Sequence, residues 1–461
     1  MSTRTLVSPD EIRTRFSSAM SKMYRAEVPQ YGTLLDLVAD INANYLKAHP
    51  EVEQALRDTD ELDRLDVERH GAIRLGLPEE LSNARRVFKV MGMHPVGYYD
   101  LSVAGVPVHS TAFRPVSDES LRRNPFRVFT SLLRLELIAD ESLRQQAADI
   151  LAKRQIFSAR ALALADVAEQ QGGLDDAQAD EFVAEVLETF RWHSDATVDA
   201  NTYQRLHDAH RLIADVVSFK GPHINHLTPR TLDIDAVQAE MPRRGISAKD
   251  VVEGPPTRQQ AILLRQTSFK ALEEPVRFVG DDKPGTHTAR FGEIEQRGMA
   301  LTRKGRALYD QLLANVREIG NVGNASPDYQ SRLETAFTQF PDDLDDIRRQ
   351  GLAFFRYVVK DEAALQQAAD AGQAWDTEQL ISQGALAAYP IVYEDFLPVS
   401  AAGIFQSNLG GTEQKSYAAN AAQAVFEQAL QAKVLDEIAL YAQAQADSLA
   451  AIQSRYQRLA A

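Results

Sequence analysis

The feature that most constrains the fold of this chain is the order of its expected helices and strands. One order, a strand followed by a helix and then by further strands, occurs twice. In the first occurrence, a helix opened by Pro78 follows the first of three expected strands, at 65–75, 96–103 and 106–113. In the second, a helix whose apolar residues begin at Ile234 follows the first of four, at 223–227, 261–266, 275–279 and 289–296. The recurrence lies in element order rather than in residues, and it predicts an α+β fold.

Helical sequence separates and flanks the two units. Ser8-Pro9-Asp10-Glu11 combines an N-cap serine, a proline at the first helical position and a capping-box glutamate. The run 118–219 is rich in Ala, Leu, Gln, Glu and Arg, the composition of a helical insertion. We therefore expect five parts: an N-terminal helical segment at 1–60, a first βαββ module at 61–117, the insertion at 118–219, a second βαβββ module at 220–300, and a mixed region at 301–461 that closes the pocket and ends in one long helix at 417–459.

The charge balance limits the expected partners. The 461 residues include 50 Lys and Arg against 65 Asp and Glu, a formal charge of −15. Such an acidic chain lacks the basic field that attracts nucleic acids and anionic membranes, so neither is expected as a partner, and no obligatory protein partner is inferred. No run of about 18 apolar residues occurs and the first residues lack the apolar core of a signal peptide, so the expected compartment is the cytoplasm.

The sequence contains no cysteine. This excludes disulfides, thiolate nucleophiles, iron–sulfur clusters and Cys-ligated zinc, so a metal ion must be held by His, Asp or Glu. The motifs GxxxxGK[ST], GxGxxG, HExxH and GxSxG are also absent, which leaves nucleotide hydrolysis, Rossmann redox chemistry and serine hydrolysis without support. The remaining candidates are histidines and carboxylates on expected strands.

The first candidate pair is His70 and Arg74. On a strand they emerge on one face, about 13 Å apart, with the small Ala72 between them. A histidine for a metal and an arginine for a carboxylate can flank one small molecule there, and the simpler alternative is a surface histidine with a solvated arginine.

The second candidate pair is His223 and His226. A separation of three on a strand places their rings on opposite faces, so one of them at most is expected to bind a given metal. The alternative for each is a hydrogen-bonded structural histidine.

The third candidate pair is Glu293 and Glu295, which share one face of an expected strand. A buried carboxylate needs a compensating partner, and a bound cation is one such partner. Periodicity does not choose between the two, and an edge strand with a solvated acidic face is the alternative. Two histidines and one carboxylate together match the facial triad of non-haem Fe(II) oxygenases, which leaves positions open for a 2-oxo acid and O₂.

Three blocks resemble the bacterial 2-oxoadipate dioxygenase/decarboxylase family: LDVERHGAIR (65–74), HINHLTPR (223–230) and RFGEIEQRG (290–298). The resemblance covers nearly the whole chain, including the segment 398–403. This family belongs to the vicinal-oxygen-chelate superfamily. The resemblance therefore implies a half-open β-barrel built from two βαβββ modules, with large helical insertions and helical termini.

The resemblance also implies roles for individual residues. It makes His70, His226 and one glutamate the Fe(II) ligands, and a second likeness, to the FLEIIQR strand of hydroxyphenylpyruvate dioxygenases, selects Glu293 over Glu295. Arg74 is similar to the family arginine that holds a substrate carboxylate. Independently of the resemblance, a chain of charge −15 repels a dianion and needs local guanidinium groups to bind it, so we expect Arg230 and Arg297 as helpers of Arg74. Two further residues resemble the pocket-lining segment: Val399 and Ser400.

The activity implied is Fe(II)-dependent conversion of 2-oxoadipate and O₂ to 2-hydroxyglutarate and CO₂, by oxidative decarboxylation and then hydroxylation, in lysine catabolism. The residues alone leave two alternatives open. One is a hydrolase, isomerase or lyase that uses another divalent metal on the same scaffold. The other is a non-enzymatic ligand-binding module.

Overall fold

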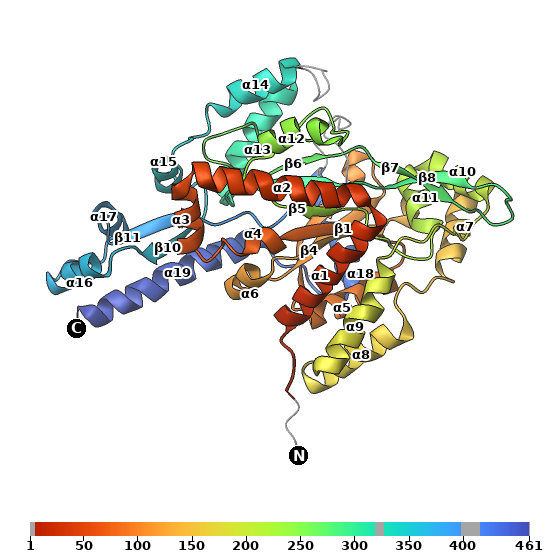
Figure 1. The fold of residues 1–461 in the computed structure, drawn as a ribbon, viewed down its shortest axis with the longest axis horizontal. Helices are drawn as coiled ribbons and strands as arrows, with labels where there is room; N and C mark the ends of the chain where they lie inside the picture. The colour runs from red at the N-terminus through yellow and green to blue at the C-terminus, as the bar shows by residue number, and fades with distance from the viewer. Residues whose placement is uncertain (1–4, 319–326, 398–414, 461) are drawn as a thin grey trace.

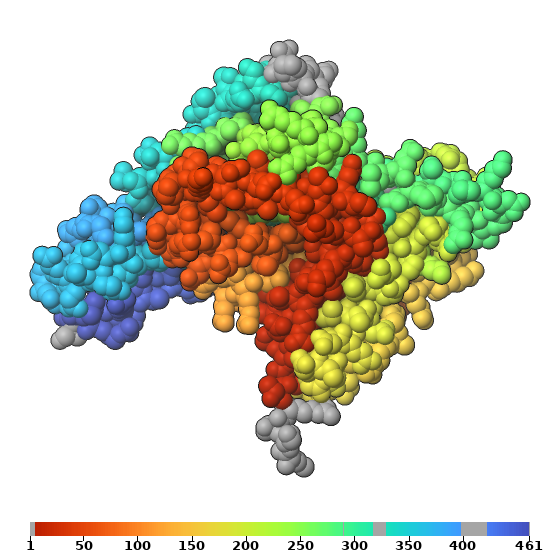
Figure 2. Space-filling view, viewed as in Figure 1, coloured from red at the N-terminus to blue at the C-terminus, as the bar shows by residue number. Residues whose placement is uncertain are grey.

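The computed structural model describes residues 5–318, 327–397 and 415–460. Its N-terminal part is helical, as expected, with the Ser8 hydroxyl accepting a hydrogen bond from the Glu11 amide at 3.2 Å. The helices here are α1 (Pro9–Glu27), α2 (Pro29–Ala48) and α3 (Pro50–Asp58). In the space-filling view, these N-terminal residues (red) cover the centre of the face shown (Figure 2).

A five-stranded sheet forms the centre of the molecule, in the order β2-β3-β4-β1-β5. Its strands are β1 (Arg69–Leu75), β2 (His94–Asp100), β3 (Val108–Arg114), β4 (Arg127–Leu133) and β5 (Leu227–Pro229). β1 runs parallel to β4 and antiparallel to β5. The helix α5 (Pro78–Val90) connects β1 to β2, which confirms the helix expected from Pro78.

Two expectations for this part were wrong. The run expected as one strand at 65–75 begins as the helix α4 (Arg64–Val67), whose Arg64 pairs with Glu68 one helical turn later at 3.1 Å. The run 118–219 is not purely helical, because it contributes β4 to the middle of the sheet. Every residue of β4 is buried, so the strand lacks the alternation of polar and apolar residues by which strands are recognised.

Helices make up most of the rest of 118–219 and pack around the sheet (Figure 1). They are α6 (Asp118–Arg123), α7 (Glu141–Leu151), α8 (Ala159–Gln171), α9 (Asp176–Thr189), α10 (Ala200–Ala209) and α11 (Arg211–Val217). Figure 1 shows α10 and α11 beside the strand β8 of the second unit. This contact between the helical run and the second unit matters for the site.

The second unit contains α12 (Ile234–Glu240) and two strand pairs. β6 (Leu264–Ser268) pairs with β9 (Glu293–Arg297), and β7 (Leu272–Val276) pairs with β8 (Gly285–Arg290), all antiparallel. The single strand expected at 289–296 is therefore two strands. They are separated at Gly292, where an added Cβ would lie 1.9 Å from the ring of Phe269, so only glycine fits against that ring.

β9 lies next to the end of β5 and so joins the second unit to the central sheet. The residue after β5, Arg230, bridges to Glu295 of β9, and the amide of Thr231 donates to the Glu295 carbonyl at 2.7 Å. Strands from both units thus converge where the candidate residues lie.

The C-terminal part mixes helices and a strand pair, as expected. Its elements are α13 (Arg303–Glu318), α14 (Pro327–Phe337), α15 (Leu344–Arg349), β10 (Phe355–Val359), α16 (Glu362–Asp370), α17 (Thr377–Ser382), β11 (Leu386–Pro390), α18 (Lys415–Leu430) and α19 (Glu437–Leu459). None of the described helices is both long enough and apolar enough to span a bilayer.

The prediction of one continuous helix at 417–459 was wrong, because the structure has two helices there. Gln431 has a φ of 56°, which ends α18, and the following segment runs beside β2. There the Leu435 amide donates to the Pro95 carbonyl at 2.9 Å, and the Gly97 amide donates to the Leu435 carbonyl at 2.9 Å. These sheet-like bonds explain why an Ala- and Gln-rich run is interrupted between two helices.

Candidate metal centre

Strand β1 carries His70, Ala72 and Arg74 on one face, as its register requires. Gly71 occupies the other face, where an added Cβ would lie 2.6 Å from the Ile224 side chain and 3.0 Å from the His226 carbonyl oxygen. The absence of a side chain at Gly71 therefore lets the chain around His226 approach β1 closely. This approach brings the two candidate histidines together.

The segment that carries His223 and His226 is irregular, because β5 begins only at Leu227, and the strand expected at 223–227 was wrong. Backbone bonds hold it instead: the Asn225 amide donates to the Ala72 carbonyl at 3.1 Å, and the Phe291 amide donates to the Asn225 carbonyl at 3.1 Å. The segment is thus held between β1 and the start of β9. The expectation that the two histidines do not share a metal is supported, since each belongs to a different cluster.

The first cluster consists of His70, His226 and Glu293, whose donor atoms all lie within 4.8 Å of one another. Nε2 of His70 lies 3.0 Å from Oε1 of Glu293, and Nε2 of His226 lies 3.8 Å from the same oxygen. All three side chains are buried. The structure thus brings together three of the residues that the sequence picked out, from β1, the segment before β5, and β9.

Glu293 is held in place by uncharged donors. The Thr228 hydroxyl donates to its Oε1 at 3.2 Å, and the Gln266 amide donates to the same oxygen at 2.7 Å. Thr228 lies opposite His70 in the pairing of β1 with β5. These contacts orient the carboxylate without neutralising its charge, which a cation can then balance.

Glu295 occupies the other side of the His70 ring. Its Oε2 lies 3.0 Å from Nδ1 of His70, in an ion-pair contact that lacks the angle of a hydrogen bond. Both of its oxygens accept hydrogen bonds from Arg297 at 2.8 Å. Glu295 is therefore already paired with a guanidinium and approaches the nitrogen of His70 that faces away from Glu293.

The buried charges shift the pKa values of this cluster. Burial lowers the pKa of His226 to about 4, so its imidazole is neutral at pH 7. Burial also acts to lower the pKa of His70, but Glu295 and Glu293 outweigh it and raise that pKa. Burial acts to raise the pKa of Glu295, yet Arg297, His70 and Arg127 together bring it to about 2. Glu295 is therefore ionised at all ordinary pH values.

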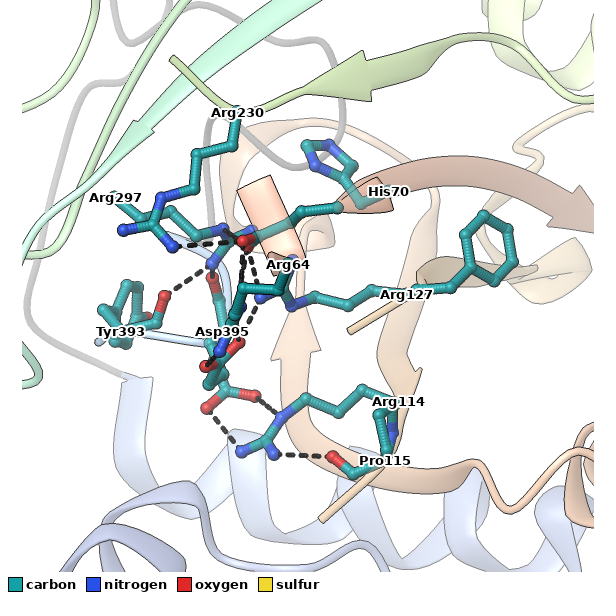
Figure 3. Close-up of polar contacts among 12 residues, drawn as sticks. Arg64, His70, Arg114, Pro115, Arg127, Arg230, Arg297, Tyr393 and Asp395 are labelled. Atoms are coloured by element: carbon teal, nitrogen blue, oxygen red, sulfur yellow. Dashed lines mark hydrogen bonds and ion pairs between the residues drawn. The ribbon is translucent and has the colours of Figure 1, made fainter. Parts of the chain in front are cut away.

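Behind Glu295 lies a buried network of arginines and carboxylates. Figure 3 shows arginines from separate elements of the fold in this network, joined by dashed lines to carboxylates, with His70 to one side. Arg64 donates to Glu394 at 2.8 Å, Arg230 donates to Glu68 at 3.1 Å, and Arg114 donates to Asp395 at 2.7 Å. The members are Arg64, Glu68, Arg114, Arg127, Arg230, Glu295, Arg297, Glu394 and Asp395.

This network changes the interpretation of two arginines. Arg230 and Arg297 were expected as helpers for a substrate carboxylate, but both are buried and paired with Glu68 and Glu295. Arg127 contacts Glu68, Glu394 and, at 3.8 Å, Glu295. The arginines fix the position of Glu295, and through it the His70 ring.

Aromatic rings pack against the two histidines. Phe396 meets His70 edge-on with ring centroids 4.9 Å apart, and Phe291 lies against His226 at 4.7 Å. The expected pocket residues Val399 and Ser400 lie outside the described residues. Phe396, which contacts His70, lies three residues before Val399 in the sequence.

The second cluster consists of Asp215, His223 and His287, again with donor atoms within 4.8 Å of one another. Oδ1 of Asp215 lies 2.9 Å from Nε2 of His287 and 3.3 Å from Nε2 of His223. Its Oδ2 accepts a hydrogen bond from Arg74 at 2.7 Å. Arg74 thus lies next to the second cluster, and its charge also contributes to lowering the pKa of His226, after burial.

Sequence reasoning missed Asp215 and His287. Asp215 interrupts the apolar run LIADVV of α11, and a lone carboxylate inside such a run is the signal that was available. His287 lies in the polar stretch THTAR of β8, where nothing distinguishes it from a surface residue. Both are buried.

The chemistry of the first cluster suits a divalent metal ion. Two imidazoles and one carboxylate form a donor set that several divalent metals accept. Nε2 of both histidines faces the Glu293 carboxylate, which has no Arg or Lys partner among the described residues, so a cation can bind between them. Among the described residues, the His70, His226 and Glu293 group can therefore hold a metal ion.

The comparisons with known proteins agree over nearly the whole chain. The profile of a family described as 2-oxoadipate dioxygenase/decarboxylase matches residues 16–408. A Pseudomonas putida protein of that name is 60% identical over 455 residues, which cover 98% of each chain. An Escherichia coli protein of that name is 60% identical over 440 residues, which cover 95% of this chain and 97% of that one.

A solved structure agrees equally well. The crystal structure described as the hydroxyglutarate synthase from Pseudomonas putida in complex with 2-oxoadipate superposes with a TM-score of 0.93 at 59% identity. The match covers 99% of this chain and 100% of that one. The likeness therefore extends to both units of the fold and to the helices between them.

Proposed function

Because the chain belongs to the 2-oxoadipate dioxygenase/decarboxylase family, we propose that it converts 2-oxoadipate and O₂ to 2-hydroxyglutarate and CO₂ with Fe(II) as cofactor. The observation that carries the proposal is the buried group of His70, His226 and Glu293, with Arg74 on the same face of β1 as His70. The family name and the donor set point to the same chemistry.

His70, His226 and Glu293 are the proposed metal ligands. Two neutral imidazoles and one carboxylate leave a ferrous ion with net positive charge, which favours a 2-oxo carboxylate. When bound, the ion supplies open coordination positions for the 2-oxo acid and O₂. Glu293 is favoured over Glu295 because Glu295 is already paired with Arg297.

The ligands must lose their protons before they bind a metal. His226 is neutral at pH 7, because its pKa is about 4. His70 has a raised pKa, so metal binding displaces a proton from the nitrogen that faces Glu293. The Glu295 carboxylate, 3.0 Å from Nδ1, favours the tautomer that keeps the remaining proton on that nitrogen.

Arg74 is the proposed partner of the carboxylate at the far end of the substrate. In a protein of charge −15 a dianion is repelled at long range, so a local guanidinium is needed to hold it. Val399 and Ser400 are proposed to line the same pocket, supported by the contact of Phe396 with the His70 ring.

For the fold, we propose a vicinal-oxygen-chelate-like half-open barrel made of two βαβββ modules. The bridge between Arg230 and Glu295 supports it, because it extends the order β2-β3-β4-β1-β5 through β9 to β6. The first module then includes β4 as its last strand. The metal ligands come from both modules, which is why they are so far apart in sequence.

Oxygen uptake with Fe(II) and a panel of 2-oxo acids tests the proposed function. We expect uptake with 2-oxoadipate, release of CO₂, and formation of 2-hydroxyglutarate in equal amounts. His226→Ala should abolish all three. Turnover of 2-oxoadipate at the same rate without air would instead identify a lyase or isomerase that uses the same ligands.

A further inference from the structure

The Asp215 carboxylate receives contacts from three nitrogen-bearing side chains. Arg74 donates to Oδ2 at 2.7 Å, while Nε2 of His287 and Nε2 of His223 lie 2.9 Å and 3.3 Å from Oδ1. Asp215 is only 7% exposed, and burial alone would raise its pKa. His223 and Arg74 instead bring the pKa of Asp215 well below its usual value, so the carboxylate is ionised.

Hydrogen bonding selects the tautomer of His287. A carboxylate can only accept, so Nε2 of His287 carries the proton that faces Asp215. Nδ1 of the same ring then accepts a hydrogen bond from the Tyr203 hydroxyl at 2.7 Å. The chain of contacts from Tyr203 through His287 and Asp215 ends at Arg74.

Aromatic rings hold the two imidazoles in place. Trp192 stacks on His287 at an interplanar angle of 4° and meets His223 edge-on with ring centroids 4.7 Å apart. Phe219 packs against His287 at 4.8 Å. Trp192, Tyr203, Asp215 and Phe219 all belong to the mainly helical run 118–219, which thus builds a rigid support around Arg74.

This cluster is not built like a metal site. A guanidinium lies 2.7 Å from the Asp215 carboxylate and would repel a cation there. Nε2 of His287 carries a proton, so it offers no lone pair to a metal. The arrangement is a satisfied hydrogen-bond network with one open participant, Arg74.

Arg74 is the member of the network that can reach a ligand. The side chain of Arg74 is 18% exposed to solvent, whereas the side chain of Asp215 is 8% exposed. Nη1 makes the hydrogen bond to Asp215, and among the described residues the guanidinium makes no other hydrogen bond. The edge formed by Nε and Nη2 remains for a second carboxylate, which a guanidinium can bind with two parallel hydrogen bonds.

We infer that Asp215, oriented by His223 and His287, is a positioning residue that aims the free edge of Arg74 at the far carboxylate of a 2-oxo dicarboxylic acid. The inference rests on the proposed function for the identity of the ligand. Asp215 does not touch the substrate. It makes the protein select dicarboxylic over monocarboxylic 2-oxo acids, because a mobile Arg74 would lose the alignment for two parallel bonds.

Anaerobic calorimetric titration of the Fe(II)-loaded protein tests this inference. The probes are 2-oxoadipate and 2-oxohexanoate, which has the same chain length without the far carboxylate. Asp215→Asn should raise the Kd for 2-oxoadipate about tenfold or more, the value of a hydrogen bond to a charged group, and leave the Kd for 2-oxohexanoate within twofold. In air, the KM for 2-oxoadipate should rise with little change in kcat.

Asp118→Asn is the matched control, because it removes another partly buried aspartate that pairs with an arginine, Arg356. It should change neither Kd. Equal losses for both ligands in Asp215→Asn would overturn the inference, as would loss of a second equivalent of bound metal. If the wild-type protein takes up no O₂ with 2-oxoadipate, the proposed function fails, and the two Kd values still decide the role of Asp215.

Discussion

Two buried clusters in this protein contain the same residue types, two histidines and one carboxylate, within the same 4.8 Å limit. In the first, Glu293 accepts hydrogen bonds from Thr228 and Gln266, which are uncharged. In the second, Asp215 accepts a hydrogen bond from the charged Arg74. A metal ion can displace the proton that His70 holds toward Glu293, whereas the guanidinium of Arg74 keeps its charge beside Asp215.

The difference shows that proximity of donor atoms does not by itself define a metal site. What separates the clusters is where the protons and the neighbouring charges lie. Nε2 of His226 faces a carboxylate that has no Arg or Lys partner among the described residues, whereas both ring nitrogens of His287 already have hydrogen-bond partners. We therefore expect the first cluster to bind the metal and the second to orient the arginine that binds the substrate.

The largest effect should come from removing a ligand of the first cluster. His226→Ala should reduce bound iron from one equivalent to nearly none. Oxygen uptake should fall about 10³-fold or more, because a metal stabilises developing charge by several kcal/mol. Iron content by metal analysis and O₂ uptake with an electrode measure the two changes.

His223→Ala is the matched comparison, since His223 is equally buried and only three residues away. This variant should keep its iron and lose affinity for the dicarboxylic substrate. Equal loss of iron in both variants would mean that the two clusters do not differ in the way we describe.

A pH effect on the metal-free protein should be the next largest. The pKa of His226 is about 4 in the folded protein and near 6.5 when unfolded. The unfolded state therefore binds a proton between these values that the folded state does not. Stability due to His226 is full above pH 6.5 and falls as the pH drops toward 4, by up to about 3 kcal/mol.

Chemical denaturation at pH 7 and pH 4.5 can measure this loss in wild type and in His226→Gln. The variant should lose less stability over the interval. His70 has a raised pKa, so its own contribution has the opposite sign and is lost as the pH rises. Identical pH profiles for wild type and His226→Gln would show that His226 is not held neutral by burial.

The sequence predicted much of the fold, and its failures share a cause. Helices with clear N-terminal signals, such as the serine cap of α1 and the proline that opens α5, were confirmed. β4 was missed because a strand buried on both faces has no alternation to recognise. The break between α18 and α19 depends on pairing with β2, a contact between distant parts of the chain that no local pattern contains.

For the site, the sequence supplied the residue types, and the fold supplied their partners. Strand periodicity could not separate Glu293 from Glu295, because both lie on one face. The distinction comes from Arg297 on one side of His70 and His226 on the other, a matter of tertiary packing. Asp215 and His287 are 72 residues apart, so only the folded chain shows that they meet.

A smaller effect should follow from Glu295→Gln, which tests the support behind the first cluster. Removing a carboxylate that fixes a ligand histidine typically weakens metal binding about 10- to 100-fold. Competition with a chelator of known affinity measures this. The folded protein should also be less stable, because Arg297 loses its charged partner.

Glu68→Gln separates the two consequences. Glu68 is a buried carboxylate of the same network, but it contacts Arg64, Arg127 and Arg230 rather than His70. It should lower stability by a similar amount and leave iron affinity within about threefold, because the His70 ring keeps Glu295. If both variants lost iron affinity equally, the weaker iron binding of Glu295→Gln would result from a general loss of order in the buried network. It would not result from the contact of Glu295 with His70.

The smallest effect should come from Tyr203→Phe at the far end of the second cluster. This change removes the hydroxyl that donates to Nδ1 of His287, so the tautomer that holds Asp215 is less strongly fixed. The loss of one neutral hydrogen bond, about 0.5–1.5 kcal/mol, should raise the KM for 2-oxoadipate about two- to tenfold. Iron content, and the KM for 2-oxohexanoate, should not change, since neither depends on Arg74. A fall in kcat with an unchanged KM would instead mean that Tyr203 affects the reaction at the first cluster. The two clusters would then not have the separate roles proposed for them.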